Sequence, residues 1–524
     1  MRLTYLATTT LLLLAALIGC MSYQPSIHPT PKKNILLIIT DDLNMNIRAY
    51  GNEHIVTTNI DKLASQGIKF NRAYVQQSVC SASRASFLSG MRPDSTGVDY
   101  PYSHYFVNNL SKKVPLLSSY FKQNGYYTRH LGKIHHGPDI ENLSASHFSA
   151  PQPNWGLESN QKLLGKKGGH KNLPPYESAP VEDDFYEDGK VAEAAVREIK
   201  QLTDNKTPFF LAVGFKKPHL PFRAPSKYWD LYDANQLELA KNRTLPVDSP
   251  DYATAHYALK SWNYESSTPT KNISLSAERK LRHAYFAAIS YMDAQVGKVM
   301  KELKIQGLAD NTIVVFISDH GYHLGEQGAW GKTTNFENAT QVPLIISAPD
   351  MIKANSESNA LIEYVDLYPT LVDLAGLKLP EHLEGTSFKP LLESPKRPWK
   401  TAAFSQFPRG VLSDLEGYTI RTNRYRYVEW YDKKQKQITA RELYDHDIDP
   451  SESINIALNS ENSTLINNLS NQLKMGWKAA LPPGIKNHSN NPIAPPAYAW
   501  GKEGKKRREV YLRRYGQKPA DANE

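Results

Sequence analysis

Three short apolar runs along the chain predict buried strands. They cover residues 34–40, 209–213 and 312–318, and each is rich in β-branched or aromatic residues. Because apolar residues are continuous in these runs rather than alternating, both faces of each strand must be buried, as in the parallel strands of an α/β protein. Each run leads into polar residues, namely Asp41-Asp42, Lys216-Lys217-Pro218-His219 and Asp319-His320. Active sites of α/β proteins lie beyond the carboxyl ends of such strands, so the three clusters predict one site.

Segments with helical periodicity lie between these predicted strands. Between 277 and 303, apolar residues recur at steps of three and four and form one stripe, which predicts a helix packed on the core: Leu281, Tyr285, Ala288, Met292, Val296, Val299 and Leu303. The stretch 225–271 has little periodicity and many Tyr, Asn and Pro residues, which predicts a long functional loop on the surface.

The C-terminal third shows a different pattern. After a predicted linker at 395–398, alternating residues at 417–421 and 425–430 predict antiparallel strands, and 463–477 predicts a helix. The predicted fold is therefore α/β, with a smaller C-terminal α+β domain.

Two cysteines, Cys20 and Cys80, are too few for a disulfide framework in a chain of 524 residues. The overall composition also excludes disordered, collagen-like and multi-span membrane classes. We therefore expect each sulfur to have an individual role.

Cys20 ends a segment that is typical of a targeting signal. Arg2 supplies a basic start, and the apolar run 11–17 is too short to span a bilayer core of about 30 Å. Leu17-Ile18-Gly19-Cys20 resembles the lipobox of bacterial lipoproteins, whose Cys is acylated and becomes the mature N-terminus; an ordinary secreted protein with a chance Cys is the alternative. We predict an exported protein, anchored to a membrane by lipid and facing the periplasm or in the outer membrane.

These features predict five parts of the chain. They are a lipoprotein signal peptide at 1–19, a tether at 20–33, the main domain at 34–395, the α+β subdomain at 396–481 and an extended basic tail at 482–524.

The formal net charge of +9 is concentrated toward the C-terminus, because residues 501–524 hold eight basic and four acidic residues. No helix-turn-helix, zinc-finger or aromatic RNA-binding pattern accompanies this charge, so nucleic acid is not an expected partner. An exported basic protein fits an anionic polysaccharide or a lipid surface better, and a merely solvated charged face is the alternative.

Cys80 lies where a polar turn leads into a predicted helix. A thiol at a helix N-terminus beside an Arg would have a lowered pKa and be reactive, whereas a buried inert Cys is the alternative. Cys80-Ser81-Ala82-Ser83-Arg84, followed by Ser89-Gly90-Met91-Arg92-Pro93, resembles the signature of the type I sulfatases. In that family a maturation enzyme oxidises the Cys to formylglycine, an aldehyde whose hydrate is the nucleophile. The commonest family motif has Pro where this chain has Ala82.

The resemblance extends over nearly the whole mature chain. Matching motifs are Asp41-Asp42 and the segments 132–137, 217–223, 319–326, 330–332, 442–446 and 449–450. The family's alkaline-phosphatase-like fold implies a mixed, mainly parallel sheet flanked by helices. Within the family the likeness is greatest to the iduronate-2-sulfatases, through 217–223, 335–340 and 405–409.

Family position then implies roles for individual residues. Asp41, Asp42, Cys80 as formylglycine, Asp319 and His320 would hold one divalent cation, with Ca²⁺ preferred over Mg²⁺, although many sulfatases have Asn at the position of His320. The remaining residues would be catalytic. Arg84 would hold the formylglycine diol, and Lys133 and Lys332 would neutralise the sulfate oxygens. The general acid would be His219 or Lys332, and the base would be His135 or His136. The iduronate-2-sulfatase pattern favours His136.

The expected activity is hydrolysis of sulfate esters in a uronic-acid-containing polysaccharide or its oligosaccharides, of the ulvan or glycosaminoglycan type. Specificity is expected in the loops at 100–109 and 225–271, with exo-action from a closed pocket. The alternatives are a phosphodiesterase or phosphonate hydrolase of the same superfamily, and a non-catalytic glycan-binding lipoprotein.

Overall fold

The computed structural model describes residues 32–98, 110–136, 155–164, 166, 173–203, 207–254, 273–348, 354–409 and 415–491. From Lys33 onward the chain forms one compact unit. The predicted signal peptide, Cys20, nearly all of the predicted tether and most of the basic tail lie outside the described residues, as does the predicted specificity loop at 100–109. Within the described ranges, no helix combines the length and apolar character that crossing a membrane requires.

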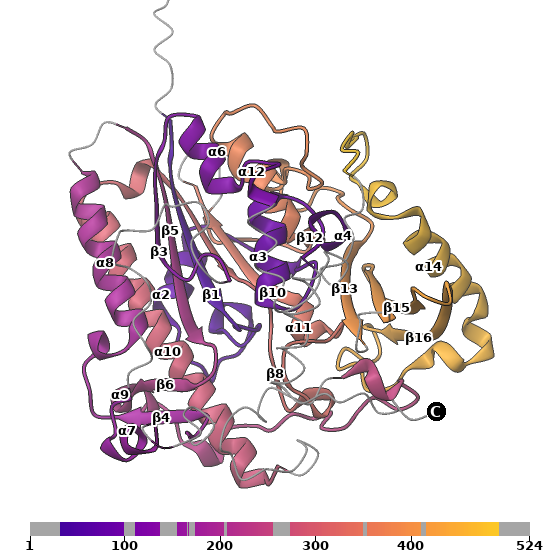
Figure 1. The fold of residues 1–524 in the computed structure, drawn as a ribbon, viewed down its shortest axis with the longest axis horizontal. Helices are drawn as coiled ribbons and strands as arrows, with labels where there is room; N and C mark the ends of the chain where they lie inside the picture. Colours follow the sequence, from indigo (N-terminus) through magenta and orange to yellow (C-terminus); the bar gives the residue numbers. More distant parts are fainter. Residues whose placement is uncertain are drawn as a thin grey trace, which may run out of the picture. The chain divides into compact units, whose positions relative to one another are not determined.

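A mixed sheet of eight strands forms the centre of the unit (Figure 1). Its order is β11-β2-β10-β7-β1-β5-β3, and β12 also pairs with β2. The four strands β7, β1, β5 and β3 are parallel to one another, whereas β10 runs antiparallel to both of its neighbours. The strands are β1 (Asn34–Asp41), β2 (Ile68–Tyr74), β3 (Tyr127–Gly132), β5 (Phe209–Pro218), β7 (Thr312–Ser318), β10 (Gln341–Ser347), β11 (Ser356–Ser358) and β12 (Ile362–Glu363).

Helices cover both faces of this sheet, and each face has its own core. All eight residues of β1 are buried: Leu36 and Ile38 join a core with α2, α8 and α10, whereas Ile35, Leu37 and Ile39 join a second core with α3, α6 and α12. Successive side chains of a strand point to opposite faces, so a strand covered on both sides has to be continuously apolar. The described helices are α2 (Thr58–Ser65), α3 (Cys80–Ser89), α4 (Pro93–Thr96), α6 (Leu117–Gln123), α7 (Glu158–Leu164), α8 (Glu187–Leu202), α9 (Ser226–Trp229), α10 (Leu275–Ile305), α11 (Glu337–Thr340), α12 (Leu367–Leu374), α13 (Lys389–Glu393) and α14 (Ser463–Met475).

The predicted elements lie close to the observed ones. α10 contains the whole predicted stripe, and Ser274 precedes it as the N-cap, whose side chain accepts a hydrogen bond from the Ala277 N–H. β5 is longer than predicted and includes Lys216 and Lys217, so these lysines lie in the strand rather than after it. α14 ends at Met475 instead of 477, because Gly476 with φ 73° leaves the helical region.

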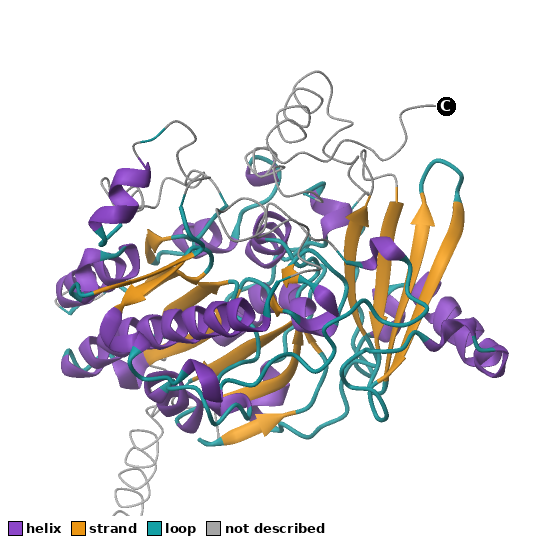
Figure 2. Cartoon of the chain, turned by 90° about the horizontal axis from the view of Figure 1, so that it is seen from below, coloured by secondary structure: helices purple, strands orange, loops and turns teal. Residues whose placement is uncertain are grey.

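A second sheet follows in the C-terminal part, as Figures 1 and 2 show. Its four antiparallel strands are β13 (Ala403–Arg409), β14 (Leu415–Arg421), β15 (Tyr425–Asp432) and β16 (Gln437–Asp445), in that order, and α14 packs against it. Two small sheets complete the fold, β4 (Tyr176–Ala179) with β6 (Phe222–Pro225) and β8 (His323–Leu324) with β9 (Trp330–Gly331).

The described part of the predicted loop at 225–271 is bound to the C-terminal sheet. We call residues 237–254 the strap segment. Val247 pairs with the backbone of Ser453 and Asn455, and the ring of Tyr252 lies 5.1 Å from that of Trp430. The strap segment is therefore attached to the C-terminal sheet, and most of its residues are exposed or partly exposed, as the prediction of a surface loop requires. Residues 255–272 lie outside the described residues.

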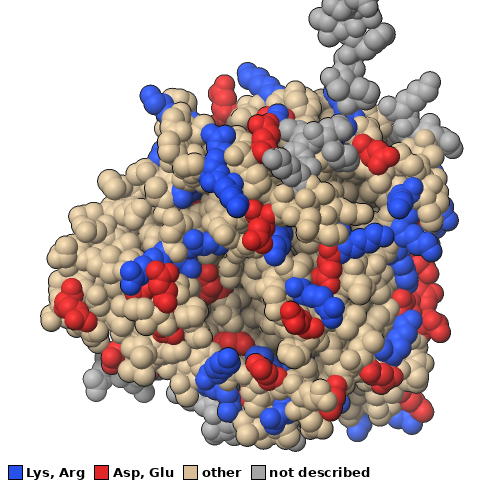
Figure 3. Space-filling view, turned by 180° about the vertical axis from the view of Figure 1, so that it is seen from behind, with Lys and Arg blue, Asp and Glu red and all other residues tan. Residues whose placement is uncertain are grey.

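Charged side chains of both signs are interspersed on the face of the molecule in Figure 3. The excess of basic residues at 501–524 lies outside the described ranges.

Candidate active site

The register of the central sheet brings the three predicted polar clusters to one edge. Thr40 on β1 pairs with Ser318 on β7, and Asp41 pairs with Pro218 on β5. The carboxyl ends of these parallel strands therefore coincide, and the residues that follow meet. The Asp42 N–H donates to Asp319 Oδ1 at 3.2 Å, and the Asp319 N–H donates to the Thr40 carbonyl at 3.0 Å.

Asp42 adopts a left-handed backbone conformation, with φ 68°. Asp tolerates this region better than most residues because its short side chain bonds locally. The hydroxyl of Tyr285 on α10 donates to the Asp42 carbonyl at 2.6 Å and accepts from the Asn44 N–H at 3.0 Å. This tyrosine holds the turn in which β1 ends, so the turn presents both Asp41 and Asp42 to the residues around Cys80.

Cys80 is the first residue of α3 and is only 2% exposed. Its Sγ lies 3.3 Å from Asp41 Oδ1, 3.2 Å from His320 Nε2 and 3.0 Å from Lys332 Nζ. Burial and Asp41 act to raise the pKa of the Cys80 thiol, but Lys133 and Lys332 outweigh them and the pKa is lowered. The lowered pKa expected from the sequence is therefore present, and two lysines far away in the sequence cause it.

Arg84 lies one helical turn after Cys80 and is fully enclosed, with 1% of its surface exposed. Its Nε donates to Asp319 Oδ2 at 2.9 Å, and its Nη1 donates to the carbonyls of Lys133 and Ile134. A buried guanidinium needs such partners because an uncompensated buried charge is costly. Arg84 therefore ties α3 to Asp319 and to the segment that carries Lys133.

Two lysines neutralise the buried carboxylates. Lys133 Nζ contacts Asp41 Oδ2, and Lys332 Nζ lies 2.5 Å from Asp42 Oδ1. Burial acts to raise the pKa of Asp41, but Lys133, His219 and Lys332 hold it well below its usual value. Both lysines remain charged, because neighbouring carboxylates raise their pKa values against the effect of burial.

The residues present fit a divalent cation. Ligand atoms of Asp41, Cys80, Asp319 and His320 lie within 4.8 Å of one another, and so do those of Asp41, Asp42, Cys80 and His219. Three carboxylates supply the hard oxygen ligands that Ca²⁺ and Mg²⁺ prefer. His320 Nε2 lies 3.4 Å from Asp42 Oδ1, and its Nδ1 bonds the Gly321 carbonyl, so Nε2 is the nitrogen that faces the carboxylates. Burial lowers the pKa of His320, but Asp319 raises it to about 9.

The histidines after Lys133 differ in their surroundings. Burial, followed by the charges of Lys133 and Lys332, lowers the pKa of His136 to about 3, which places His136 in the field of both lysines. The ring of His135 instead packs 5.5 Å from that of His130, and His130 bonds Ser118. The choice of His136 over His135 as the site residue therefore stays a prediction from the family pattern.

His219 follows β5 and faces the carboxylates. Its Nε2 lies 4.0 Å from Asp42 Oδ2, and its Nδ1 donates to the Leu220 carbonyl at 2.6 Å. Burial lowers the pKa of His219 to about 4, so the ring is neutral at pH 7 and Nε2 carries no proton. Lys217, in the same motif, points away: its ammonium donates to the carbonyls of His219 and Pro221, both at 2.6 Å.

One supporting residue was not predicted as part of the site. Arg409, at the end of β13, donates to the carbonyls of Thr333, Tyr252 and Ala253 at 2.7, 2.6 and 3.0 Å. Thr333 follows Lys332 directly, so Arg409 joins the Lys332 loop to the strap segment. In the sequence, the motif at 405–409 resembled the family, but it gave no indication of a role for Arg409.

Comparison with known proteins identifies the family. Residues 33–377 match the family described as "Sulfatase", and residues 325–478 match the C-terminal region of N-sulphoglucosamine sulphohydrolase. Iduronate 2-sulfatase of Mus musculus is 34% identical over 523 residues, which cover 84% of this chain and 93% of the relative. The chain belongs to the sulfatase family.

Bacterial sulfatases are similar over comparable lengths. A sulfatase of Formosa agariphila is 30% identical, covering 82% of this chain and 83% of the relative. An ulvan-active sulfatase of the same bacterium is 26% identical, and the match covers 90% of this chain and 87% of the relative. Family membership confirms that the protein is a sulfuric ester hydrolase.

Solved structures confirm the predicted fold class. A putative sulfatase of Bacteroides fragilis superposes with a TM-score of 0.65 at 26% identity, covering 85% of this sulfatase and 95% of that chain. A 2-O GAG sulfatase gives a TM-score of 0.65 at 25% identity, and the match covers 85% of this chain and 91% of that chain. The mixed central sheet flanked by helices and the smaller antiparallel C-terminal sheet are therefore those of the family.

Proposed function

We propose that this sulfatase hydrolyses sulfate esters of a uronic-acid-containing glycan of the ulvan or glycosaminoglycan type, and that Cys80 acts as formylglycine. The observation that carries the proposal is the buried cluster around Cys80 Sγ, in which Asp41, His320 and Lys332 all lie within 3.3 Å. The substrate class is supported by relatives whose names include iduronate 2-sulfatase and ulvan-active sulfatase.

The residues divide the chemistry among them. Hydrolysis needs a nucleophile at sulfur, neutralisation of the sulfate oxygens and a proton for the leaving alkoxide. The nucleophile is the hydrated aldehyde formed from Cys80, and the Arg84 guanidinium beside it orients that group. Lys133 and Lys332 supply positive charge to the sulfate oxygens, in a site where burial strengthens each interaction.

Asp41, Asp42, Asp319 and His320 would hold the divalent cation together with residue 80, and we prefer Ca²⁺ over Mg²⁺. When bound, the cation polarises a sulfate oxygen and the hydroxyl of the nucleophile.

Lys332 is the better candidate for the proton donor. It carries its proton at neutral pH, whereas Nε2 of His219 carries none. His136 is neutral and lies near Lys133, so it can accept a proton from the second hydroxyl and expel sulfate. General acid catalysis matters most for poor leaving groups. Lys332→Ala should therefore lose more activity on an alkyl sulfate than on nitrophenyl sulfate, whereas His219→Ala should lose similar activity on both.

Export and lipid anchoring through Cys20 are part of the same proposal. They are supported by the lipobox-like sequence, and they place the enzyme at the outer membrane or facing the periplasm, where a sulfated polysaccharide is accessible. The maturation enzyme has to act on Cys80 before folding, because all ten residues of α3 are buried.

Two measurements test the proposal. Sulfate release from defined sulfated oligosaccharides should be highest on those with a uronic acid, and Cys80→Ala should abolish it while circular dichroism stays unchanged. A thiol titration of the denatured native protein should find no free thiol, because lipidation removes one and oxidation the other. An active preparation whose Cys80 peptide carries only unmodified thiol by mass spectrometry would refute the nucleophile.

A further inference from the structure

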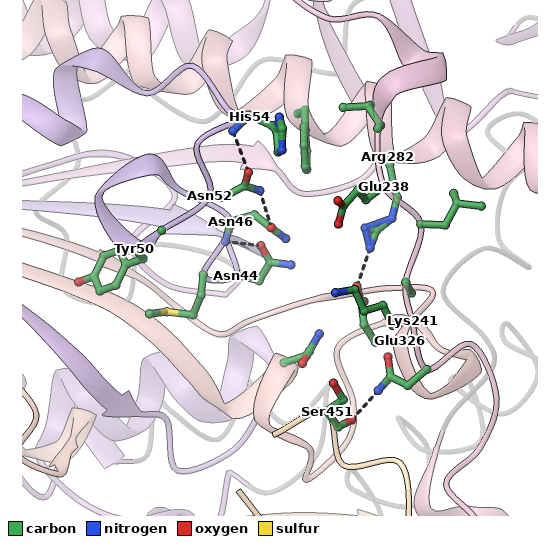
Figure 4. A pocket seen from close by; sticks show the side chains of 18 of the residues that line it. Asn44, Asn46, Tyr50, Asn52, His54, Glu238, Lys241, Arg282, Glu326 and Ser451 are labelled. Atoms are coloured by element: carbon green, nitrogen blue, oxygen red, sulfur yellow. Dashed lines mark hydrogen bonds and ion pairs between the residues drawn. The ribbon is translucent and has the colours of Figure 1, made fainter. Parts of the chain in front are cut away.

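A polar cavity and an apolar cavity lie outside the catalytic centre. The polar one, shown in Figure 4, has groups that bond one another: Asn52 Nδ2 donates to Asn46 Oδ1 at 2.8 Å, and Arg282 Nη2 donates to Glu326 Oε1 at 2.6 Å. The apolar one has a volume of about 710 Å³ and lies between α4, the C-terminal sheet, the end of α14 and residues 489–491. We call it the C-terminal cavity. Exposed apolar surface of this kind marks a place where another segment or partner binds.

The floor of the C-terminal cavity is an uncovered part of a sheet face. Ile420 and Tyr427 of the C-terminal sheet share a core with α14. Tyr418 lies two residues before Ile420, and Tyr431 lies four residues after Tyr427, so all four side chains point to the same face. Tyr418, Tyr431 and Ile438, which pairs with Tyr431 on β16, line the cavity. α14 therefore covers one part of this face and leaves the adjoining part open.

Aromatic rings dominate the apolar walls. Six apolar or aromatic side chains of the walls are partly exposed: Phe404, Tyr418, Tyr431, Ile438, Leu473 and Trp477. The ring of Trp477 is fixed in place, because the guanidinium of Arg92 stacks on it at 4.9 Å. Grooves lined by aromatic rings bind proline-rich segments, whose polyproline II conformation is preformed and loses little entropy on binding. The walls therefore match an apolar segment that contains prolines.

The chain itself supplies such a segment. Residues 492–500 read Pro-Ile-Ala-Pro-Pro-Ala-Tyr-Ala-Trp, with three prolines and no charged or amide side chain. Pro492 and Pro495 have the P-x-x-P spacing of segments that aromatic grooves recognise. The residues that follow, 501–524, include eight basic and four acidic side chains. An uncharged apolar run directly before a charged tail indicates a segment that binds a surface.

Hydrogen bonds fix the point from which this segment starts. Asn487 Nδ2 donates to the Leu383 carbonyl at 2.9 Å, and Asn491 Nδ2 donates to the His382 carbonyl at 2.7 Å. Asn491 Nδ2 also lies 3.1 Å from Glu384 Oε1, and both of these residues belong to the cavity walls. The chain is therefore held along one side of the C-terminal cavity, and residues 492–500 start from the wall itself.

We propose that residues 492–500 dock in the C-terminal cavity and cover the open part of the sheet face. The occupant is this chain's own segment rather than a second copy, because its first residue is covalently joined to a wall residue. Such a link gives the segment a high effective concentration at the cavity. The docked segment contacts α4 and the C-terminal sheet at once and so holds these two parts of the enzyme together.

Limited proteolysis of the full-length enzyme with chymotrypsin tests the docking. Chymotrypsin cleaves after Tyr498 and Trp500 in the segment, and after Tyr511 and Tyr515 in the charged tail beyond it. Mass spectrometry of the released fragments gives the rate at each position. We expect cleavage after Tyr498 to be about tenfold slower than after Tyr511, because the docked segment has to leave the cavity before it is cut. Dilution of the enzyme should not change this ratio.

Two variants alter the cavity at partly exposed positions, so the sheet should still fold, which circular dichroism checks. Ile438→Asp and Tyr431→Ser should each speed cleavage after Tyr498 about tenfold and leave cleavage after Tyr511 unchanged. Leu458→Asp is the control, because Leu458 is 71% exposed and does not line the cavity. This variant should keep the native protection.

Equal rates of cleavage after Tyr498 and Tyr511 in the native enzyme would overturn the proposal, as would native protection in both cavity variants. Protection that disappears on dilution would assign the cavity to a second copy of the chain and would also overturn it. Because sulfate release is not measured, none of these results depends on the catalytic proposal.

Discussion

Arg409 offers a sharp test of how the C-terminal sheet supports catalysis. Its guanidinium makes three hydrogen bonds to backbone carbonyls of other segments and stacks on the rings of Phe407 and Trp430, at 4.8 and 5.6 Å. The substitution Arg409→Met keeps the aliphatic stem and removes every donor. Arg409→Lys keeps the charge but can reach only one of the three carbonyls at a time.

The magnitude follows from these contacts. A hydrogen bond from a charged donor contributes about 1.5–3 kcal/mol, and Arg409 is only partly buried, so the lower value applies to each bond. Arg409→Met should therefore reduce the free energy of unfolding by about 4.5 kcal/mol at most. Releasing the Thr333 carbonyl also frees the Lys332 loop, and a displacement of about 1 Å at a catalytic group lowers kcat about 100-fold.

The assay measures kcat and KM with a small aryl sulfate. Such a substrate reaches the catalytic centre around Lys332 without contacting glycan-binding loops, so a change in kcat reflects the catalytic centre. We expect kcat to fall with little change in KM, by about 100-fold in Arg409→Met and about tenfold in Arg409→Lys. Arg441→Met on β16 is the matched control, because its Nε bonds Tyr427 on the same sheet and does not reach the site. Native kcat in a folded Arg409→Met variant, or an equal loss in the control, would refute the reasoning.

Three further predictions concern buried charges and the cation. Burial acts to raise the pKa of Glu363, but Arg92 and Lys400 outweigh it and lower the pKa from 4.5 to about 2. The ionised Glu363 therefore contributes about 3 kcal/mol to the free energy of unfolding above pH 4.5, and this contribution is lost as the pH falls toward 2. Urea unfolding of Glu363→Gln should therefore depend less on pH in that window, and a native pH dependence would contradict the assignment. Arg84→Met removes the guanidinium that pairs with the buried Asp319 and should lower the free energy of unfolding by about 3–5 kcal/mol; a loss below about 1 kcal/mol would contradict the buried pair. Exhaustive chelation should abolish sulfate release, and Ca²⁺ should restore it better than Mg²⁺; full activity without metal would exclude the proposed cation.

The sequence by itself determined the main elements and the motifs of the site. Continuous apolar runs identified β1, β5 and β7, because a strand buried on both faces has no polar positions. A stripe at steps of three and four identified α10, since one face of that helix packs on the core. Cys80, Asp41, Asp42 and Asp319 were found because each sits in a short motif beside such an element.

Tertiary structure alone decided which of these groups meet, and how. The register of β1 with β7 joins Asp42 to Asp319, and Lys332 reaches the Cys80 thiol from a distant segment. Arg409 bonds Thr333 and Ala253, which lie 76 and 156 residues away in the sequence, through backbone carbonyls. A carbonyl is present in every residue, so such contacts leave no pattern in the sequence. For the same reason the attachment of the strap segment to the C-terminal sheet was not predicted from the sequence.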